Sequence, residues 1–168
     1  MKKICEGKRL LLLDNDDWEY VERKKGKEAV VVVAITDDNR AILTEQLRKP
    51  VNARVIDWPA GLVGDDGEND PAKTAKKELR EETGYECDSV ELLTRGTTSP
   101  GITSELVSLY RAVGVRKVGK GGGVGGEDIQ VHEIPLDAIE QWVKKQNGAG
   151  KLIDAKLWAG LYFIPQST

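Results

Sequence analysis

A glycine-rich loop followed directly by a helix with three glutamates on one side constrains this chain more than any other feature. It occupies residues 61–85, GLVGDDGENDPAKTAKKELREETGY. At about 100° per residue, Glu78, Glu81 and Glu82 share one narrow sector of the helix surface. Such carboxylates suit Mg²⁺ or Mn²⁺, which prefer oxygen ligands and keep waters and substrate phosphates in their shell. The helix therefore indicates a metal-binding site for a reaction at phosphate.

The remaining faces of the helix fit packing on a sheet on one side and solvent on the other. Ala72, Ala75 and Leu79 form a small apolar sector suited to docking on a sheet, and lysines and an arginine occupy the solvent side. Taken from the residues alone, a second interpretation stays open. The acidic sector is then the solvated face of an ordinary amphipathic helix.

The same stretch resembles the Nudix box, the signature of the Nudix hydrolases, G-x5-E-x7-R-E-U-x-E-E-x-G-U with U aliphatic or aromatic. Residues 78–85, ELREETGY, match its carboxyl-terminal part. Two departures are visible: Lys77 replaces the usual Arg, and the segment between Gly61 and Lys77 is one residue longer than the pattern. Either Glu68 or Asn69 fills the early Glu position, and we prefer Glu68.

Length and composition limit the other classes of protein. The 168 residues fit one domain, and the net charge of −3 argues against nucleic acid as a partner. No apolar run approaches the ~20 residues that span a bilayer, so no membrane partner is expected. Cys5 and Cys87 are not clustered, which predicts neither a zinc site nor a disulfide scaffold and favours a cytoplasmic protein.

Hydrophobic patterning predicts a mixed α/β domain. Residues 29–35, AVVVVAI, are continuously apolar and β-branched, as in a central strand buried on both faces. Residues 8–13 and Trp18–Arg23 predict an amino-terminal β-hairpin. Further strands are expected at residues 41–48, 55–58, 90–95, 105–113 and 129–134.

Two terminal helices and one glycine-rich loop complete the expected order. Residues 135–146 predict a helix with Pro135 in its first turn, and residues 153–163 predict a last helix. Residues 119–126 form an almost featureless loop, which fits a lid over a site or a disordered connector.

Motifs outside the box also resemble this family and indicate one branch of it. The motifs WEYVER, EQLR, PAG, SPG and EDI occur in order and at sensible spacing, at residues 18–23, 45–48, 59–61, 99–101 and 127–129. Together they resemble the ADP-ribose pyrophosphatase branch, which hydrolyses nucleoside diphosphate sugars. The resemblance implies a Nudix-type α/β/α sandwich with a mixed sheet, as a single domain over residues 1–168. It also implies a homodimer, with residues 1–28 contributing to the dimer and residues 29–168 forming the catalytic core.

The resemblance also implies the metal site and the catalytic groups. The metal ligands are the backbone carbonyl of Ala60, then Glu78 and Glu82, with Glu81 in support and Glu127 from the late loop. They would hold two or three Mg²⁺ ions, or Mn²⁺ in their place. Glu127 is the expected catalytic base, with the box glutamates Glu81 and Glu82 as alternatives. Lys77 is expected to orient the carboxylates or, alternatively, to form an ordinary surface pair.

Four further residues are implied to bind substrate. Arg48 is expected to approach the pyrophosphate. Trp18 and Arg23 resemble residues near the nucleotide or the dimer contact, although Trp18 also fits a hairpin or interface position. Glu105 is expected to contact ribose or metal, or to lie in an exposed loop. His132, the only histidine, is expected to be structural.

The resemblance predicts hydrolysis of ADP-ribose to AMP and ribose 5-phosphate. Three alternatives stay open. The first is a relative selective for GDP-mannose or another nucleoside diphosphate derivative. The second is a housecleaning enzyme acting on nucleoside triphosphates. The third, of a different class, is a non-catalytic nucleotide-sugar-sensing Nudix module.

Overall fold

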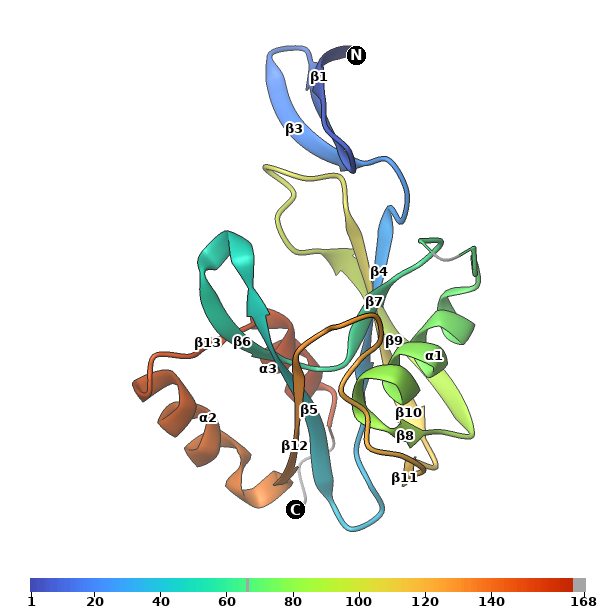
Figure 1. Cartoon of the computed structure of the whole chain (residues 1–168), viewed down its shortest axis with the longest axis vertical. Helices are drawn as coiled ribbons and strands as arrows, with labels where there is room; N and C mark the ends of the chain where they lie inside the picture. Colours follow the sequence, from blue (N-terminus) through green and yellow to red (C-terminus); the bar gives the residue numbers. More distant parts are fainter. Residues whose placement is uncertain (66, 165–168) are drawn as a thin grey trace.

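The structure, a computed structural model, describes residues 1–65 and 67–164. A body of two four-stranded sheets with helices on both sides carries a three-stranded arm (Figure 1). The strands are β1 (Lys2–Glu6), β2 (Leu10–Asn15), β3 (Trp18–Arg23), β4 (Glu28–Val33), β5 (Arg40–Arg48), β6 (Ala53–Asp57), β7 (Ala60–Leu62), β8 (Tyr85–Glu86), β9 (Ser89–Thr97), β10 (Leu106–Val113), β11 (Arg116–Lys117), β12 (Ile129–Pro135) and β13 (Leu152–Ile153). The helices are α1 (Pro71–Thr83), α2 (Ile139–Gly148) and α3 (Ala155–Tyr162), with short 3₁₀ turns at Lys49–Val51 and Leu136–Ala138.

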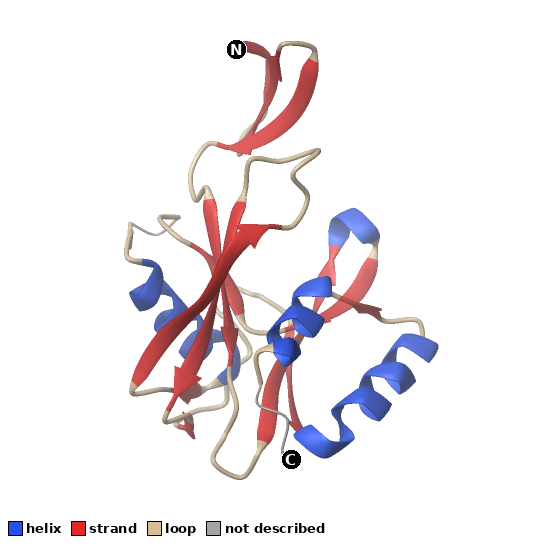
Figure 2. Cartoon of the chain, turned by 180° about the vertical axis from the view of Figure 1, so that it is seen from behind, coloured by secondary structure: helices blue, strands red, loops and turns tan. Residues whose placement is uncertain are grey.

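Strand β4 is buried on both faces and separates the two halves of the core. Val30 and Val32 pack in one cluster with Leu79 of α1. Val31 and Val33 alternate to the other face, into the cluster that contains buried residues of α2 and α3. The predicted central strand is therefore confirmed. The helices flank the strands as two outer layers, as Figure 2 shows from behind.

Both large sheets are mixed. One has the order β7-β4-β10-β9, in which β4 and β10 are parallel. The other has the order β12-β5-β6-β13, in which β6 and β13 are parallel. Their remaining pairings are antiparallel, so the predicted mixed-sheet α/β domain is confirmed.

The amino-terminal arm is a separate sheet of order β1-β2-β3 that extends beyond the body (Figure 1). Strands β2 and β3 confirm the predicted hairpin. Strand β1 was not predicted, because every one of its residues is exposed and no buried alternation marks it. The arm meets the body where the Val21 N–H donates to the Ile102 carbonyl at 2.7 Å.

Helix α1 begins and ends where its sequence places the caps. The Asp70 carboxylate accepts from the N–H of Ala72 at 2.9 Å and of Lys73 at 3.4 Å, and Pro71 occupies the first turn. Gly84 ends the helix with a φ of +73°, the left-handed conformation that glycine adopts readily. These caps fix the direction in which the box glutamates point.

The carboxyl-terminal helices begin later than predicted. Pro135 is the last residue of β12 rather than part of a helix, and α2 begins at Ile139 after a 3₁₀ turn. Ile153 belongs to β13, and the Asp154 carboxylate caps α3 by accepting from the Lys156 N–H at 2.9 Å. Among residues 1–65 and 67–164, no helix is both long and apolar enough to cross a membrane.

We predict that Gly160→Ala destabilises the protein by about 1–3 kcal/mol, because the added methyl overpacks the core. A Cβ on Gly160 would lie 2.2 Å from Nε1 of Trp58, which is fully buried and donates to the Leu157 carbonyl. Urea unfolding measures the loss.

The matched control is Gly148→Ala in α2. A Cβ there meets no heavy atom of the described residues within 4 Å. Because Gly148 is the last residue of α2, this variant should change the free energy of unfolding by less than about 0.5 kcal/mol. Equal destabilisation by both variants would contradict the packing of α3 on Trp58.

Candidate active site

A cleft of about 720 Å³ lies between the two large sheets, with α1 along one side. Its walls come from strands of both sheets, from the end of the arm, from the segment before β12 and from the start of α3. Seven of the site residues expected from the sequence line this one cleft: Arg23, Arg48, Ala60, Glu78, Glu82, Glu105 and Glu127.

The Glu78 carboxylate lies against the backbone of Gly61 on β7. A Cβ at Gly61 would lie 2.1 Å from the carboxyl carbon of Glu78, so only glycine leaves room for this carboxylate. Burial raises the pKa of Glu78 to about 7. The charge of Lys77 opposes this rise, and the charges of Glu81 and Glu127 add to it.

Glu82 is the most enclosed carboxylate of the cleft, with 7% of its surface exposed. The Ala60 N–H donates to its Oε2 at 3.0 Å. Burial is the largest cause that raises the pKa of Glu82 to about 8, and the charges of Glu78 and Glu127 act in the same direction. The Ala60 hydrogen bond and the charge of Arg48 act in the opposite direction. A helix thus holds two carboxylates, partly desolvated, at one wall of the cleft.

Glu127 reaches the cleft from the segment before β12. Its Oε2 accepts from the Val124 N–H at 3.1 Å. Its charge affects the pKa of both Glu78 and Glu82, which brings acids from distant parts of the sequence to one place.

These residues suit a divalent cation. Two carboxylates with raised pKa values gain from a positive neighbour, and hard cations accept waters and phosphate oxygens as further ligands. Within residues 1–65 and 67–164, no group of three or more His, Cys, Asp or Glu side chains is arranged to hold a metal ion. The carboxylates of Glu78, Glu82 and Glu127 line the same cleft without forming such a group, so a cation there would also need ligands from outside the side chains.

Arginines line the same cleft. Arg48 ends β5 and lines the cleft, as does Arg9, the residue that precedes β2. The guanidinium of Arg23 forms an ion pair with the carboxylate of Glu105. The sequence did not single out Arg9, because a lone arginine beside a strand carries no distinguishing pattern.

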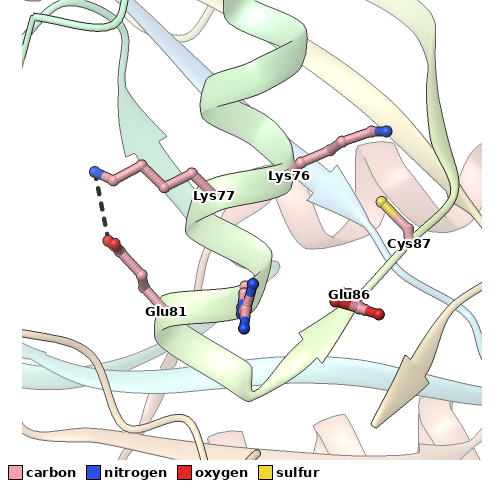
Figure 3. Close-up of a pocket in the computed structure, with 6 residues that line it drawn as sticks. Lys76, Lys77, Glu81, Glu86 and Cys87 are labelled. Atoms are coloured by element: carbon pink, nitrogen blue, oxygen red, sulfur yellow. Dashed lines mark ion pairs between the residues drawn. The ribbon is translucent and has the colours of Figure 1, made fainter. Parts of the chain in front are cut away.

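Glu81 and Trp18 lie elsewhere. Figure 3 shows Glu81 paired with Lys77 beside a second groove, whose lining also includes Lys76, Glu86 and Cys87. Nζ of Lys77 lies 3.4 Å from Oε2 of Glu81. Trp18 is 61% exposed, and its Nε1 donates to the Gly101 carbonyl at 3.3 Å. Neither residue is among the described residues that line the cleft, and their expected roles stay predictions.

The cleft also contains a charged group that sequence reasoning missed. Nζ of Lys156 lies 2.9 Å from Oδ2 of Asp57 and 2.5 Å from Oδ2 of Asp154. Burial raises the pKa of Asp57 to about 6, against the charge of Lys156. Only Asp154, as a helix cap before an apolar run, left a signal in the sequence.

His132 belongs to a buried ionic network instead. Its Nε2 lies 2.8 Å from Oε2 of Glu45, which is 1% exposed and also contacts Lys151 at 2.7 Å. Its ring lies 5.0 Å from that of Trp142. This position agrees with the structural role expected for it.

Comparison with known proteins identifies the class. Residues 25–154 match the family described as NUDIX domain, so this chain belongs to the Nudix family. The expected fold class and enzyme class, a Nudix pyrophosphohydrolase, are confirmed. A solved structure described as "Crystal structure of ADP compounds hydrolase" has the same fold, with a TM-score of 0.71 over 96% of this chain and 87% of that chain, at 19% identity.

Three curated relatives differ in what they are reported to do. A "Methanol dehydrogenase activator" of Bacillus methanolicus is 37% identical over 97% of this chain and 89% of that protein. An "ADP-ribose pyrophosphatase" of Bacillus subtilis is 40% identical over 60% of this chain and 53% of that protein. A "GDP-mannose pyrophosphatase" of Cronobacter sakazakii is 31% identical over 86% of this chain and 78% of that protein.

We predict that the metal-free protein loses stability as the pH rises from about 4.5 to 8. Because burial raises the pKa of Glu82 from 4.5 to about 8, the folded protein binds a proton that the unfolded chain has released. The stabilisation is complete below pH 4.5 and is lost as the pH passes about 8, at about 1.4 kcal/mol per pH unit.

Urea unfolding in the presence of a chelator, at pH 5.5, 6.5 and 7.5, measures this slope. The Glu82→Gln variant should show a shallower slope by that amount, because it cannot titrate at this position. Parallel slopes for the two proteins would contradict the buried position of Glu82.

Proposed function

We propose that this chain is a cytoplasmic, Mg²⁺-dependent hydrolase of the diphosphate bridge in ADP-ribose or a related nucleoside diphosphate sugar. The products are AMP, or another nucleoside monophosphate, and a sugar phosphate. The convergence of Glu78, Glu82 and Glu127 with Arg48 in one cleft carries this proposal. Relatives described as an ADP-ribose pyrophosphatase and a GDP-mannose pyrophosphatase support it.

In this proposal the acidic side of the cleft holds two or three metal ions. Glu78, Glu82, Glu127 and the Ala60 carbonyl would be the ligands, with Glu81 in support and Mn²⁺ as a possible substitute for Mg²⁺. When bound, the metal neutralises phosphate charge and lowers the pKa of a bound water. Lys77 would orient Glu81 through their ion pair. Gly61, which has no side chain, leaves room for the Glu78 carboxylate against its backbone.

The remaining residues bind and orient the substrate. Arg48 donates to phosphate oxygens, which its planar guanidinium matches well. Glu127 accepts the proton of the attacking water, with Glu81 and Glu82 as the alternative bases. Arg23 and Glu105 contact the nucleotide or the sugar. Trp18 is not among the described residues that line this cleft, and it offers an aromatic face for a base or for the dimer contact.

We expect ADP-ribose to yield AMP and ribose 5-phosphate when it is incubated with the protein and Mg²⁺. Chromatography of the products, with GDP-mannose and ATP in parallel and a chelator control, measures this. Faster cleavage of GDP-mannose would change the proposed substrate and leave the proposed reaction type unchanged. If no substrate were cleaved with Mg²⁺ or Mn²⁺, the sensing alternative would replace the proposal.

We expect Glu82→Gln to lower the rate by at least about 100-fold, because it removes a charged ligand that the backbone of Ala60 orients. Circular dichroism should show an unchanged fold. Glu140→Gln, at an exposed position of α2, is the matched control and should retain full activity. Near-normal turnover in Glu82→Gln would contradict the metal assignment.

We also propose a homodimer in which the arm of β1–β3 reaches the partner subunit. The exposed side chains of Ile4, Leu10 and Trp18 on the arm support this, because burial of apolar surface drives association. Sedimentation equilibrium should give twice the mass of one chain. A monomer at micromolar concentration would contradict it.

A second candidate function follows from the relative described as a methanol dehydrogenase activator, which aligns over 97% of this chain. We propose that activation of such a dehydrogenase is a further effect of the hydrolase. The rate of a methanol dehydrogenase should rise on addition of this protein and should not rise with Glu82→Gln. An unchanged rate with both would exclude this function.

A further inference from the structure

The glycine-rich segment of residues 118–124 is bonded to the end of helix α1. The N–H groups of Val118 and Gly119 donate to the Gly84 carbonyl at 2.8 and 2.9 Å. The Gly122 N–H donates to the Glu82 carbonyl at 2.8 Å, and the Gly123 N–H donates to the Glu81 carbonyl at 3.0 Å. The last carbonyls of a helix have no partner inside the helix, so this segment satisfies groups that water or a local turn would otherwise satisfy.

The segment approaches the helix so closely that side chains are excluded. A Cβ on Gly121, where φ is +68°, would lie 2.3 Å from the backbone carbon of Thr83 and 2.7 Å from the Glu82 carbonyl oxygen. At Gly125 and Gly126, an added Cβ meets no heavy atom of the described chain within 4 Å. The two parts of the glycine run therefore differ: the first is docked and the second is open.

The docked part continues into contacts with Glu127. A Cβ at Gly123 would lie 2.5 Å from Oε2 of Glu127, and the same oxygen accepts from the Val124 N–H at 3.1 Å. The carboxylate of Glu127 is thus bonded to the segment that caps α1.

A second anchor holds the other side of Glu127. Nη1 of Arg54 lies 2.8 Å from Oδ2 of Asp128. The same guanidinium donates to Oε1 of Glu45 at 2.5 Å and to the Glu45 carbonyl at 3.0 Å. Because Glu45 is 1% exposed and is also paired with Lys151, this anchor is fixed in the core.

We propose that residues 118–124 are a fixed cap on α1 rather than a mobile lid, and that the cap and the Arg54–Asp128 pair together position Glu127 beside Glu78 and Glu82. Gly121 and Asp128 are then positioning residues that act through Glu127. The catalytic consequence rests on the proposed function, whereas the cap itself does not.

Amide hydrogen exchange on the metal-free protein tests the cap without any assay of activity. The amides of Gly122 and Gly123 should exchange at least ~10-fold more slowly than in an unstructured chain, because each is bonded to a helix carbonyl. Exchange of both at the rate of an unstructured chain would overturn the proposal, whatever the enzyme hydrolyses.

Matched alanine variants test the positioning. Gly121→Ala and Gly125→Ala introduce the same methyl at nearly the same φ, +68° and +63°, but only the first meets backbone. We expect Gly121→Ala to lower kcat by ~10-fold or more with KM nearly unchanged, and Gly125→Ala to lower it by less than ~3-fold. Equal losses would assign the effect to backbone strain and overturn the proposal.

A double-mutant cycle shows whether the effect passes through Glu127. In the Glu127→Gln background, Gly121→Ala should lower kcat by less than ~3-fold, because the positioned group is already absent. Asp128→Ala, at a side chain that is 73% exposed, gives the same test without risk to folding. Equal fold-losses in both backgrounds, for both variants, would overturn the positioning role.

Discussion

Two carboxylates on one turn of α1, those of Glu78 and Glu82, are partly removed from water. The rest of this structure depends on keeping them there. Glu78 and Glu82 keep their places only because α1 is pressed onto β7, where Gly61 has no side chain and the Ala60 N–H is available. That contact requires Leu79 to be buried against β4, which is buried on both faces in turn. The core therefore holds together a site that would otherwise be separated by charge repulsion.

The fold could be predicted where local sequence decides the structure. Strand β4 was predicted because a run of valines leaves few alternatives, and helix α1 was predicted because its glutamates and its small apolar sector recur at helical spacing. Strands β1 and β13 were missed because backbone pairing, rather than a hydrophobic period, forms them. Pro135 was misplaced because proline suits both the first turn of a helix and the end of a strand.

The site could be predicted where several residue types recur at fixed spacing. Glu78 and Glu82 are one helical turn apart and face the cleft together, whereas Glu81 is about 100° from Glu82 and lies beside the other groove. Asp57 and Lys156 come from distant parts of the chain and form an ion pair, and no spacing in the sequence predicts such a pair. Trp18 depends on how the arm is placed, which the sequence of a single strand does not determine.

The cap on α1 also has a consequence for the order in which the chain folds. The carbonyls at the end of the helix receive their partners from a segment that follows β10 and β11 in the sequence. Contacts between such distant residues form late, because the intervening loop must first be closed at an entropic cost. During synthesis, the acidic helix therefore leaves the ribosome before the segment that completes its end.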